Sequence, residues 1–205
     1  GFDKMLAEYT RHKKMNSFAA KLIPPNYLYP AGSLQNCKVD GINFQLDISA
    51  TVEHTNYFNV DEPYQQLLYQ YVQKGMVVIY KDAIIGVTAL NFAKRVSPLG
   101  KVFSFEPSAY NYQKAAMNIS LNNFLNITLI NQGLGNEKTT AFLYNVNPNN
   151  RGMQRLLNVE DSNSVYEKTA VEIDTLDCSM QKFSIAKPSL IKIDVEGYEY
   201  KVIQG

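Results

Sequence analysis

Hydrophobic and polar residues follow two different patterns on either side of residue 75. In the first part, residues 37–49 alternate between apolar and polar side chains around Asp40-Gly41. An Asp-Gly pair flanked by alternating residues is typical of a tight β-hairpin. Residues 64–72 have the spacing of an amphipathic helix that ends at Gly75. We therefore expect residues 1–75 to form an N-terminal arm that contains a β-hairpin and helices.

From residue 76 onward, apolar runs of strand length alternate with segments of helical spacing. The run Met76-Val77-Val78-Ile79-Tyr80 contains no charged residue, as expected of a strand that is covered on both faces. Because parallel strands need crossover connections, this alternation predicts an α/β fold with a doubly wound, mainly parallel sheet over residues 76–205. The predicted strands are 76–80, 101–105, 127–131, 171–176 and 190–194, and the predicted helices are 83–95, 109–122 and the residues after Gly197. Residues 139–146 suit an edge strand or a hairpin, and residues 145–163, rich in Asn, suit a long loop.

Polar residues follow several of the predicted strands, where the binding crevice of an open parallel sheet lies. The most informative is Glu106, which ends the second strand and comes 20 residues after Gly86. An acidic side chain at this place can accept hydrogen bonds from both hydroxyls of an adenosine ribose. Alternatively, it caps the helix that Ser108 begins. The other polar strand ends are Tyr80-Lys81-Asp82, Asn131-Gln132 and Asp194 to Glu196.

Lys192 is unusual because it interrupts an otherwise apolar strand. By the two-residue period of a strand, its side chain points to the same side as Asp194. Since burial of an unpaired ammonium group is costly, we expect Lys192 to pair with a carboxylate. The candidates are Asp194, Glu196 and Glu199, and a structural ion pair and a functional cluster both remain open.

The composition is that of a globular chain without a strong charge bias. Of 205 residues, 45% are hydrophobic and 19% are charged, which excludes disordered and collagen-like classes. The net charge of +1 gives no reason to expect a nucleic acid as partner, and the apolar runs are too short to span a bilayer. Two His and two Cys without a Cys-x-x-Cys pair predict no metal site, and the basic residues 11–14 are more typical of a solvated face than of a binding site. No charged-then-apolar leader opens the chain, so we expect a cytoplasmic location.

Four segments carry a more specific signal in their order along the chain. They are Phe105-Glu106-Pro107, Asn118-Ile119-Ser120-Leu121-Asn122, Asp174-Thr175-Leu176-Asp177 and Ile191-Lys192-Ile193-Asp194-Val195-Glu196-Gly197-Tyr198-Glu199. Together they resemble the FkbM-type S-adenosylmethionine-dependent methyltransferases, over roughly residues 37–205. The resemblance implies a Rossmann-like methyltransferase fold with S-adenosylmethionine as cofactor. It also implies methyl transfer to an oxygen of a small-molecule acceptor, typically a hydroxyl of a sugar.

The resemblance also implies roles for individual residues. Glu106 would bind the ribose of the cofactor, and Asn131 and Gln132 would flank its adenine. Asp82, Ala83 and Gly86 would form the cofactor loop after the first strand. Asp194 would lie near the amino group or the transferred methyl, Glu196 would be a base or a substrate ligand, and Lys192 would complete the catalytic group. His54 is an outside candidate only, because nothing in the sequence places it near the crevice.

The cofactor loop departs from the family pattern. After its first strand the family normally has Asp-x-Gly-Ala-Asn-x-Gly, whereas this chain has Tyr80-Lys81-Asp82-Ala83-Ile84-Ile85-Gly86. The chain is then an active methyltransferase with a divergent loop, a degenerate relative that serves as a binding or interaction module, or a chain with an altered sequence. A nicotinamide-dependent oxidoreductase would also place Glu106 on a ribose, but no G-x-G-x-x-G follows the first strand.

The end of the sequence leads to a further expectation. A methyltransferase sheet of this kind has strands after the helix near Tyr198, and the sequence stops at Gly205. We therefore expect the C-terminal strands to be missing and the strand ending at Asp194 to lie at or near an open edge. An open edge favours association, so a homo-oligomer is one expected state.

Overall fold

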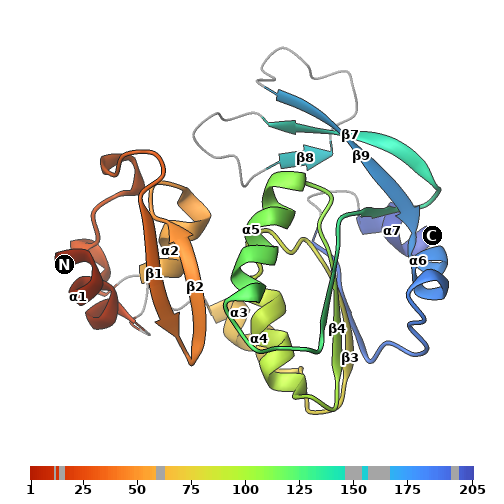
Figure 1. The fold of residues 1–205 in the computed structure, drawn as a ribbon, viewed down its shortest axis with the longest axis horizontal. Helices are drawn as coiled ribbons and strands as arrows, with labels where there is room; N and C mark the ends of the chain where they lie inside the picture. Colours follow the sequence, from red (N-terminus) through yellow and green to blue (C-terminus); the bar gives the residue numbers. More distant parts are fainter. Residues whose placement is uncertain (12, 14–16, 59–62, 146–153, 157–166, 195–198) are drawn as a thin grey trace. The chain divides into compact units, whose positions relative to one another are not determined.

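The computed structural model describes residues 1–11, 13, 17–58, 63–145, 154–156, 167–194 and 199–205. These residues form two compact units (Figure 1). The first unit contains residues 1–71 together with 120–122, and the second contains residues 72–119 and 123–205. Each unit is described separately below.

The first unit is built around the predicted β-hairpin. Strands β1 (Leu34–Val39) and β2 (Ile42–Asp47) pair antiparallel, and Asp40 and Gly41 between them have φ angles of 49° and 81°. Two positive φ angles define the tight turn that the Asp-Gly pair predicts, so this prediction is confirmed. The helices of the unit are α1 (Phe2–Thr10), η1 (Ala20–Leu22), η2 (Asn26–Leu28), α2 (Thr51–Phe58) and α3 (Pro63–Gln70).

His54 has a structural environment in this first unit. Its Nε2 lies 2.8 Å from the carbonyl oxygen of Pro24, and its ring centroid lies 4.8 Å from that of Phe58. Burial lowers the pKa of His54, so the neutral ring is favoured in this packing.

A parallel sheet of four strands, in the order β10-β3-β4-β5, forms the centre of the second unit (Figure 1). Its strands are β3 (Val77–Lys81), β4 (Lys101–Phe105), β5 (Ile127–Ile130) and β10 (Leu190–Lys192). Helices α4 (Val87–Val96) and α5 (Ala109–Ser120) follow β3 and β4, while α6 (Leu176–Lys182) and α7 (Glu199–Gln204) lie on the other side of the sheet (Figure 1). The doubly wound α/β prediction is confirmed.

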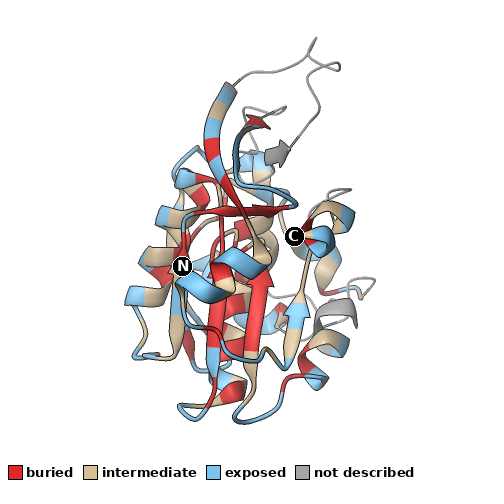
Figure 2. Ribbon diagram, turned by 90° about the vertical axis from the view of Figure 1, so that its right-hand side faces the viewer, coloured by how far each residue is buried: buried red, intermediate tan, exposed pale blue. Residues whose placement is uncertain are grey.

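The core of the second unit explains why its central strands are apolar. Ile79, Phe103 and Phe105 point to one face of the sheet, where they pack with Val202 of α7. Tyr80 belongs to the opposite face, and its ring makes an edge contact with Phe92 of α4 at 5.6 Å between centroids. Because helices cover both faces, the central strands are buried along most of their length (Figure 2).

A second sheet corrects one expectation about the strands. It has the order β6-β9-β7-β8, with β6 (Gly133–Gly135), β7 (Thr139–Asn145), β8 (Gln154–Leu156) and β9 (Glu167–Thr175). Residues 171–175 of the expected strand 171–176 belong to β9, which pairs antiparallel with β7 and parallel with β6 instead of joining the central sheet. Antiparallel strands need no crossover helix, and none separates β7 from β9 among the described residues. Strand β8 lies within the expected loop 145–163, most of which falls outside the described residues.

The helix expected at 83–95 begins only at Val87. The preceding residues cannot be helical, because Asp82, Ile84 and Gly86 have φ angles of 89°, 45° and 86°. Residues 82–86 form a tight loop between β3 and α4 instead. We refer to them as the β3–α4 loop.

Strand β10 lies at the edge of the central sheet, because in the described part of the chain it pairs with β3 alone. This confirms the expected edge position of the strand that leads to Asp194. None of the described helices combines the length and the apolar character that crossing a bilayer requires.

Candidate functional site

The register of the central sheet aligns the polar strand ends in one row. Lys192 pairs with Tyr80, Lys81 with Phe105, and Phe105 with Ile130. Continuing this register past the strands aligns four residues at the carboxyl edge, namely Asp194, Asp82, Glu106 and Asn131. The chain runs from β3 outward through β4 to β5, whereas β10 lies on the other side of β3. The strand order thus reverses between β3 and β10, which is where open α/β sheets bind their ligands.

Glu106 connects the two loops that border this edge. Its side chain is only 2% exposed. Its Oε2 accepts a hydrogen bond from the backbone N–H of Ile84 at 2.8 Å, and its Oε1 accepts one from the N–H of Ser108 at 2.9 Å. The hydroxyl of Ser108 in turn accepts from the N–H of Asn111, which confirms Ser108 as the N-cap of α5. Glu106 therefore fixes the β3–α4 loop against the start of α5.

Two buried ionisable groups, Glu106 and Lys81, lie at the carboxyl ends of the neighbouring strands β4 and β3. Burial, with a smaller contribution from the nearby Asp82, raises the pKa of Glu106 from 4.5 to about 8. Lys81 is also 2% exposed, and burial lowers its pKa from 10.5 to about 8. The negative charges of Asp82, Glu106 and Glu199 act against this decrease and favour the charged ammonium. Lys81 therefore supplies positive charge beneath the acidic end of β3.

Lys81 is not among the residues predicted for the site, although its place in an apolar strand is unusual. Lys81 ends the strand Val77-Val78-Ile79-Tyr80-Lys81, which is otherwise apolar. The same argument that predicted a partner for Lys192 applies to it, because an ammonium group in a buried strand needs compensating charge.

The backbone of the β3–α4 loop has a conformation that favours Gly and Asn, although the chain has Asp82 and Ile84 at these positions. The N–H of Asp82 donates to the carbonyl oxygen of Phe105 at 3.0 Å, and Asn118 Nδ2 of α5 donates to that of Ile85 at 2.8 Å. Asp82 and Ile84 occupy the left-handed region, which favours Gly and Asn and is strained for a β-branched residue. These are the residue types that the family pattern has at the two positions. The loop backbone is therefore held from outside by Glu106 and Asn118.

Gly86 is required at the end of this loop. It has a φ angle of 86°, and a Cβ added there would lie 3.2 Å from the Cα of Ala115 in α5. Only glycine allows this approach between the loop and the helix without strain. Ala83, the other loop residue shared with the family pattern, is 2% exposed and its N–H donates to Phe105 at 3.3 Å.

Asn131 and Gln132 lie at the outer end of the row. Asn131 Nδ2 donates to the carbonyl oxygens of Glu106 and Pro107, at 2.7 Å and 3.2 Å. Gln132 is 8% exposed, whereas Asn131 is exposed. Asn131 thus holds the chain where it leaves β4.

Lys192 and Asp194 form an ion pair at the end of the row that β10 contributes. Lys192 Nζ lies 2.8 Å from Asp194 Oδ2, and the side chains are 12% and 54% exposed. The predicted pairing of Lys192 with a carboxylate is confirmed, and the partner is Asp194. Glu196, the third expected catalytic residue, lies outside the described residues.

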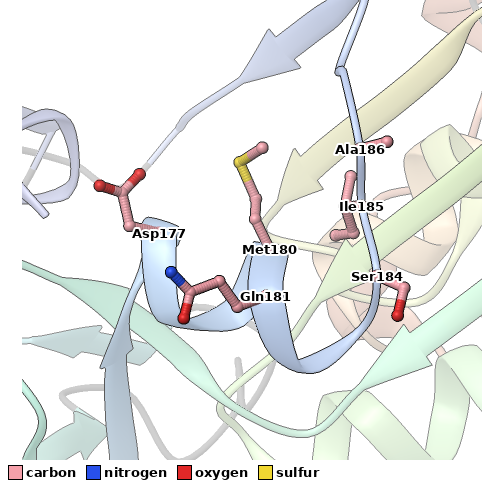
Figure 3. Close-up of a pocket in the computed structure, with 6 residues that line it drawn as sticks. All are labelled: Asp177, Met180, Gln181, Ser184, Ile185 and Ala186. Atoms are coloured by element: carbon pink, nitrogen blue, oxygen red, sulfur yellow. The ribbon is translucent and has the colours of Figure 1, made fainter.

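A cavity of about 480 Å³ lies elsewhere in the second unit, beside α6. Figure 3 shows that α6 contributes Asp177, Met180 and Gln181 and that the segment after it contributes Ser184 to Ala186. None of these residues belongs to the row. Within the described ranges, no group of three or more His, Cys, Asp or Glu side chains is placed to hold a metal ion.

Comparison with known proteins assigns the chain to a family. The chain is similar to a SAM-dependent methyltransferase from Aquifex aeolicus, with 18% identity over 38% of this chain and 45% of that chain and a TM-score of 0.33. It is similar to TYW2 from M. jannaschii in complex with AdoMet, with 22% identity over 50% of this chain and 44% of that chain and a TM-score of 0.39. It is also similar to a SAM-dependent O-methyltransferase from Thermotoga maritima, with 14% identity over 60% of this chain and 49% of that chain and a TM-score of 0.34. The chain thus spans less than half the length of each. No curated protein matches it. Residues 80–205, more than half of the chain, match the family model of the methyltransferase FkbM domain. The chain therefore belongs to the FkbM methyltransferase family.

Proposed function

We propose that this chain transfers a methyl group from S-adenosylmethionine to a hydroxyl oxygen of a small molecule, for example a sugar. The observation that carries the proposal is the row of Asp194, Asp82, Glu106 and Asn131 at the carboxyl edge of the sheet, where the strand order reverses. Membership in the FkbM family supports the reaction class. The choice of a hydroxylated small molecule as methyl acceptor is also proposed.

The residues at this edge fit S-adenosylmethionine, the cofactor of the family. The β3–α4 loop has left-handed φ angles at Asp82, Ile84 and Gly86, the conformation that a glycine-containing cofactor loop needs for close approach. Its backbone would hold the methionine part, Glu106 the ribose, and Asn131 with Gln132 the adenine. When bound, the cofactor would supply a methyl group on a sulfonium sulfur. The acceptor oxygen would form a C–O bond to this methyl group while its C–S bond breaks and the sulfur leaves.

Asp82 adds a carboxylate where the family pattern has glycine. A carboxylate at this place repels a second one, and the cofactor carries one on its methionine part. Lys81 lies beside Asp82, and the attraction between them favours the charged ammonium. We propose that Lys81 offsets this repulsion and so allows Asp82 in a cofactor loop.

Lys192 and Asp194 would act on the acceptor. The ion pair occupies Oδ2 of Asp194, and the carboxylate is half exposed at the edge of the sheet. Its other oxygen, Oδ1, would accept the proton of the acceptor hydroxyl as the oxygen reacts. Lys192 holds the carboxylate in place during this step. Glu196, two residues further on, would bind the acceptor from the same segment.

One observation favours a second function, that of a binding module without methyl transfer. Both carboxylate oxygens of Glu106 already accept hydrogen bonds from the backbone, from Ile84 and Ser108. A carboxylate oxygen can accept a second hydrogen bond, so ribose binding needs the remaining acceptor positions of a buried group. A chain in which Glu106 serves only the loop would keep the fold and lose the cofactor.

Calorimetric titration with S-adenosylmethionine and S-adenosylhomocysteine separates these functions. We expect a Kd in the micromolar range, which corresponds to about −8 kcal/mol. Methyl transfer is then followed with radiolabelled cofactor and a panel of sugars, for the wild type, Asp194→Asn and the exposed control Glu137→Gln. The proposal requires that Asp194→Asn keeps cofactor affinity and loses transfer, while Glu137→Gln changes neither. The absence of cofactor binding by the folded chain would support the binding module and contradict the cofactor assignment. Cofactor binding without transfer to any sugar of the panel would contradict the proposed acceptor class.

A further inference from the structure

The first unit contains a cavity of its own, of about 570 Å³. Its lining comes from α1, both strands of the hairpin and α2, together with Arg11 and Leu121, and all of these residues belong to the first unit. Its volume lies in the range of small-molecule sites, roughly 300–1,000 Å³. The row of polar strand ends belongs to the second unit, so this cavity is not part of the site described above.

The lining of this cavity carries an excess of positive charge. Lys4 and Glu8 are four residues apart on one face of α1, and Arg11 directly follows the last residue of this helix. Lys38 of β1 adds a third cation, and Glu8 is the one carboxylate among the lining residues. An excess of two positive charges in a chain with a net charge of +1 favours an anion in this cavity.

Arg11 has a buried group that lacks a partner. Its Nε is buried and has no hydrogen-bond partner within the described part of the chain. Leaving a buried donor unsatisfied costs about 1–3 kcal/mol, and more for a charged group. The guanidinium presents its N–H groups in a planar fork that matches the two oxygens of a carboxylate or a phosphate. A bound anion would satisfy Nε.

The other titratable groups of the lining do not cancel this charge. Cys37 and Tyr57 also line the cavity. Burial raises the pKa of the Cys37 thiol to about 11 and also raises the pKa of Tyr57, so both side chains are neutral at pH 7. On the hairpin, Gln45 Nε2 donates to Asn36 Oδ1 at 3.3 Å, which adds amide groups that suit the hydroxyls of a ligand.

We propose that this cavity binds a small, hydroxylated anion of sugar size, whose carboxylate or phosphate group pairs with Arg11. Lys4 and Lys38 contribute charge at the exposed part of the lining, and the amides of Asn36 and Gln45 contact the hydroxyls. The proposal concerns the first unit alone and is independent of the cofactor.

Titration of the full chain, without S-adenosylmethionine, tests the proposal with three probes: glucuronate, glucose 6-phosphate and neutral glucose. We expect at least one anionic probe to bind at least tenfold more tightly than glucose, and the stronger of the two identifies the anionic group. Arg11→Gln should weaken this binding at least tenfold. The matched control is Lys21→Gln, because Lys21 is exposed and does not line the cavity.

A second pair of variants keeps the test decisive if Arg11→Gln does not fold. Lys4→Gln and Lys38→Gln remove exposed charges from the lining, and each should weaken binding about three- to tenfold with an unchanged circular dichroism spectrum. The proposal is overturned if neither anion binds better than glucose at 10 mM. It is also overturned if Lys21→Gln weakens binding as much as the lining variants do, since the attraction would then come from the overall charge.

Discussion

Replacing Glu106 by Gln should change how the stability of the second unit depends on pH. The substitution keeps the size of the side chain and removes the ionisable group. The pKa of Glu106 is about 8 in the folded chain, against an ordinary value of 4.5. The folded chain therefore binds a proton that the unfolded chain releases between these two values. By linkage, the contribution of this group to the stability of the wild type is fully present below pH 4.5 and is lost as the pH rises to about 8.

Two effects of opposite sign determine the difference in free energy of unfolding between the wild type and Glu106→Gln. One pKa unit corresponds to about 1.4 kcal/mol, so the wild type loses up to about 5 kcal/mol from this group between pH 4.5 and 8. Gln has one acceptor oxygen, whereas Glu106 accepts from both Ile84 and Ser108. The variant leaves one buried N–H without an acceptor, at a cost of about 1–3 kcal/mol. We expect the wild type to be more stable by about that amount at pH 5, and the order to reverse before pH 8.

Urea denaturation at pH 5, 6, 7 and 8, followed by circular dichroism, measures this difference. The chain has no Trp, so tyrosine fluorescence is the second probe. Two compact units can unfold in separate steps, so two transitions are fitted wherever the two probes disagree. The series ends at pH 8, because Lys81 has a pKa of about 8 and its own titration dominates at higher pH.

Parallel stability curves for the wild type and Glu106→Gln would refute the argument. They would mean that Glu106 is ionised in the folded chain throughout this range, with Lys81 as its counter-ion. The exposed control Glu137→Gln should follow the wild type at every pH. A reversal of stability in the control would show that a general charge effect, and not burial of Glu106, produces the dependence.

Three further substitutions test the loop and the ion pair. Gly86→Ala should destabilise the chain by about 1–3 kcal/mol, because of its φ angle of 86° and the close backbone of α5, and a decreased Tm checks this. Asp82→Gly should stabilise the loop by about 1 kcal/mol through relief of its φ angle of 89°, and should lower the pKa of Glu106, which shifts the pH dependence above. Lys192→Met should change stability by less than about 1 kcal/mol, since Asp194 is 54% exposed, and it should reduce methyl transfer. A large loss of stability would mean that the ion pair has a structural role.

The central sheet could be predicted because its strands are encoded locally. Strands β3 and β4 are short apolar runs, and the hydrophobic pattern of α5 begins directly after the cap at Ser108. The cost of a buried charge predicted that Lys192 pairs with a carboxylate, and the structure identifies Asp194 among the three candidates. Strand β9 was assigned to the wrong sheet, because its apolar pattern is the same in an antiparallel pair and the partner strand is set by the topology.

The conformation of the β3–α4 loop could not be predicted, because it is imposed by residues distant in sequence. Ile84 and Ile85 have the spacing of a helix, yet Glu106 and Asn118 bind the loop backbone in a non-helical form. The loop thus has left-handed φ angles that suit Gly and Asn, although Asp82 and Ile84 occupy these positions. Shape and side-chain chemistry are separable here. A loss of cofactor binding would therefore be attributed first to the carboxylate of Asp82 or the apolar Ile84. A failure of Asp82→Gly combined with Ile84→Asn to restore binding would leave two causes, namely Tyr80, the third departure from the family pattern, and Glu106.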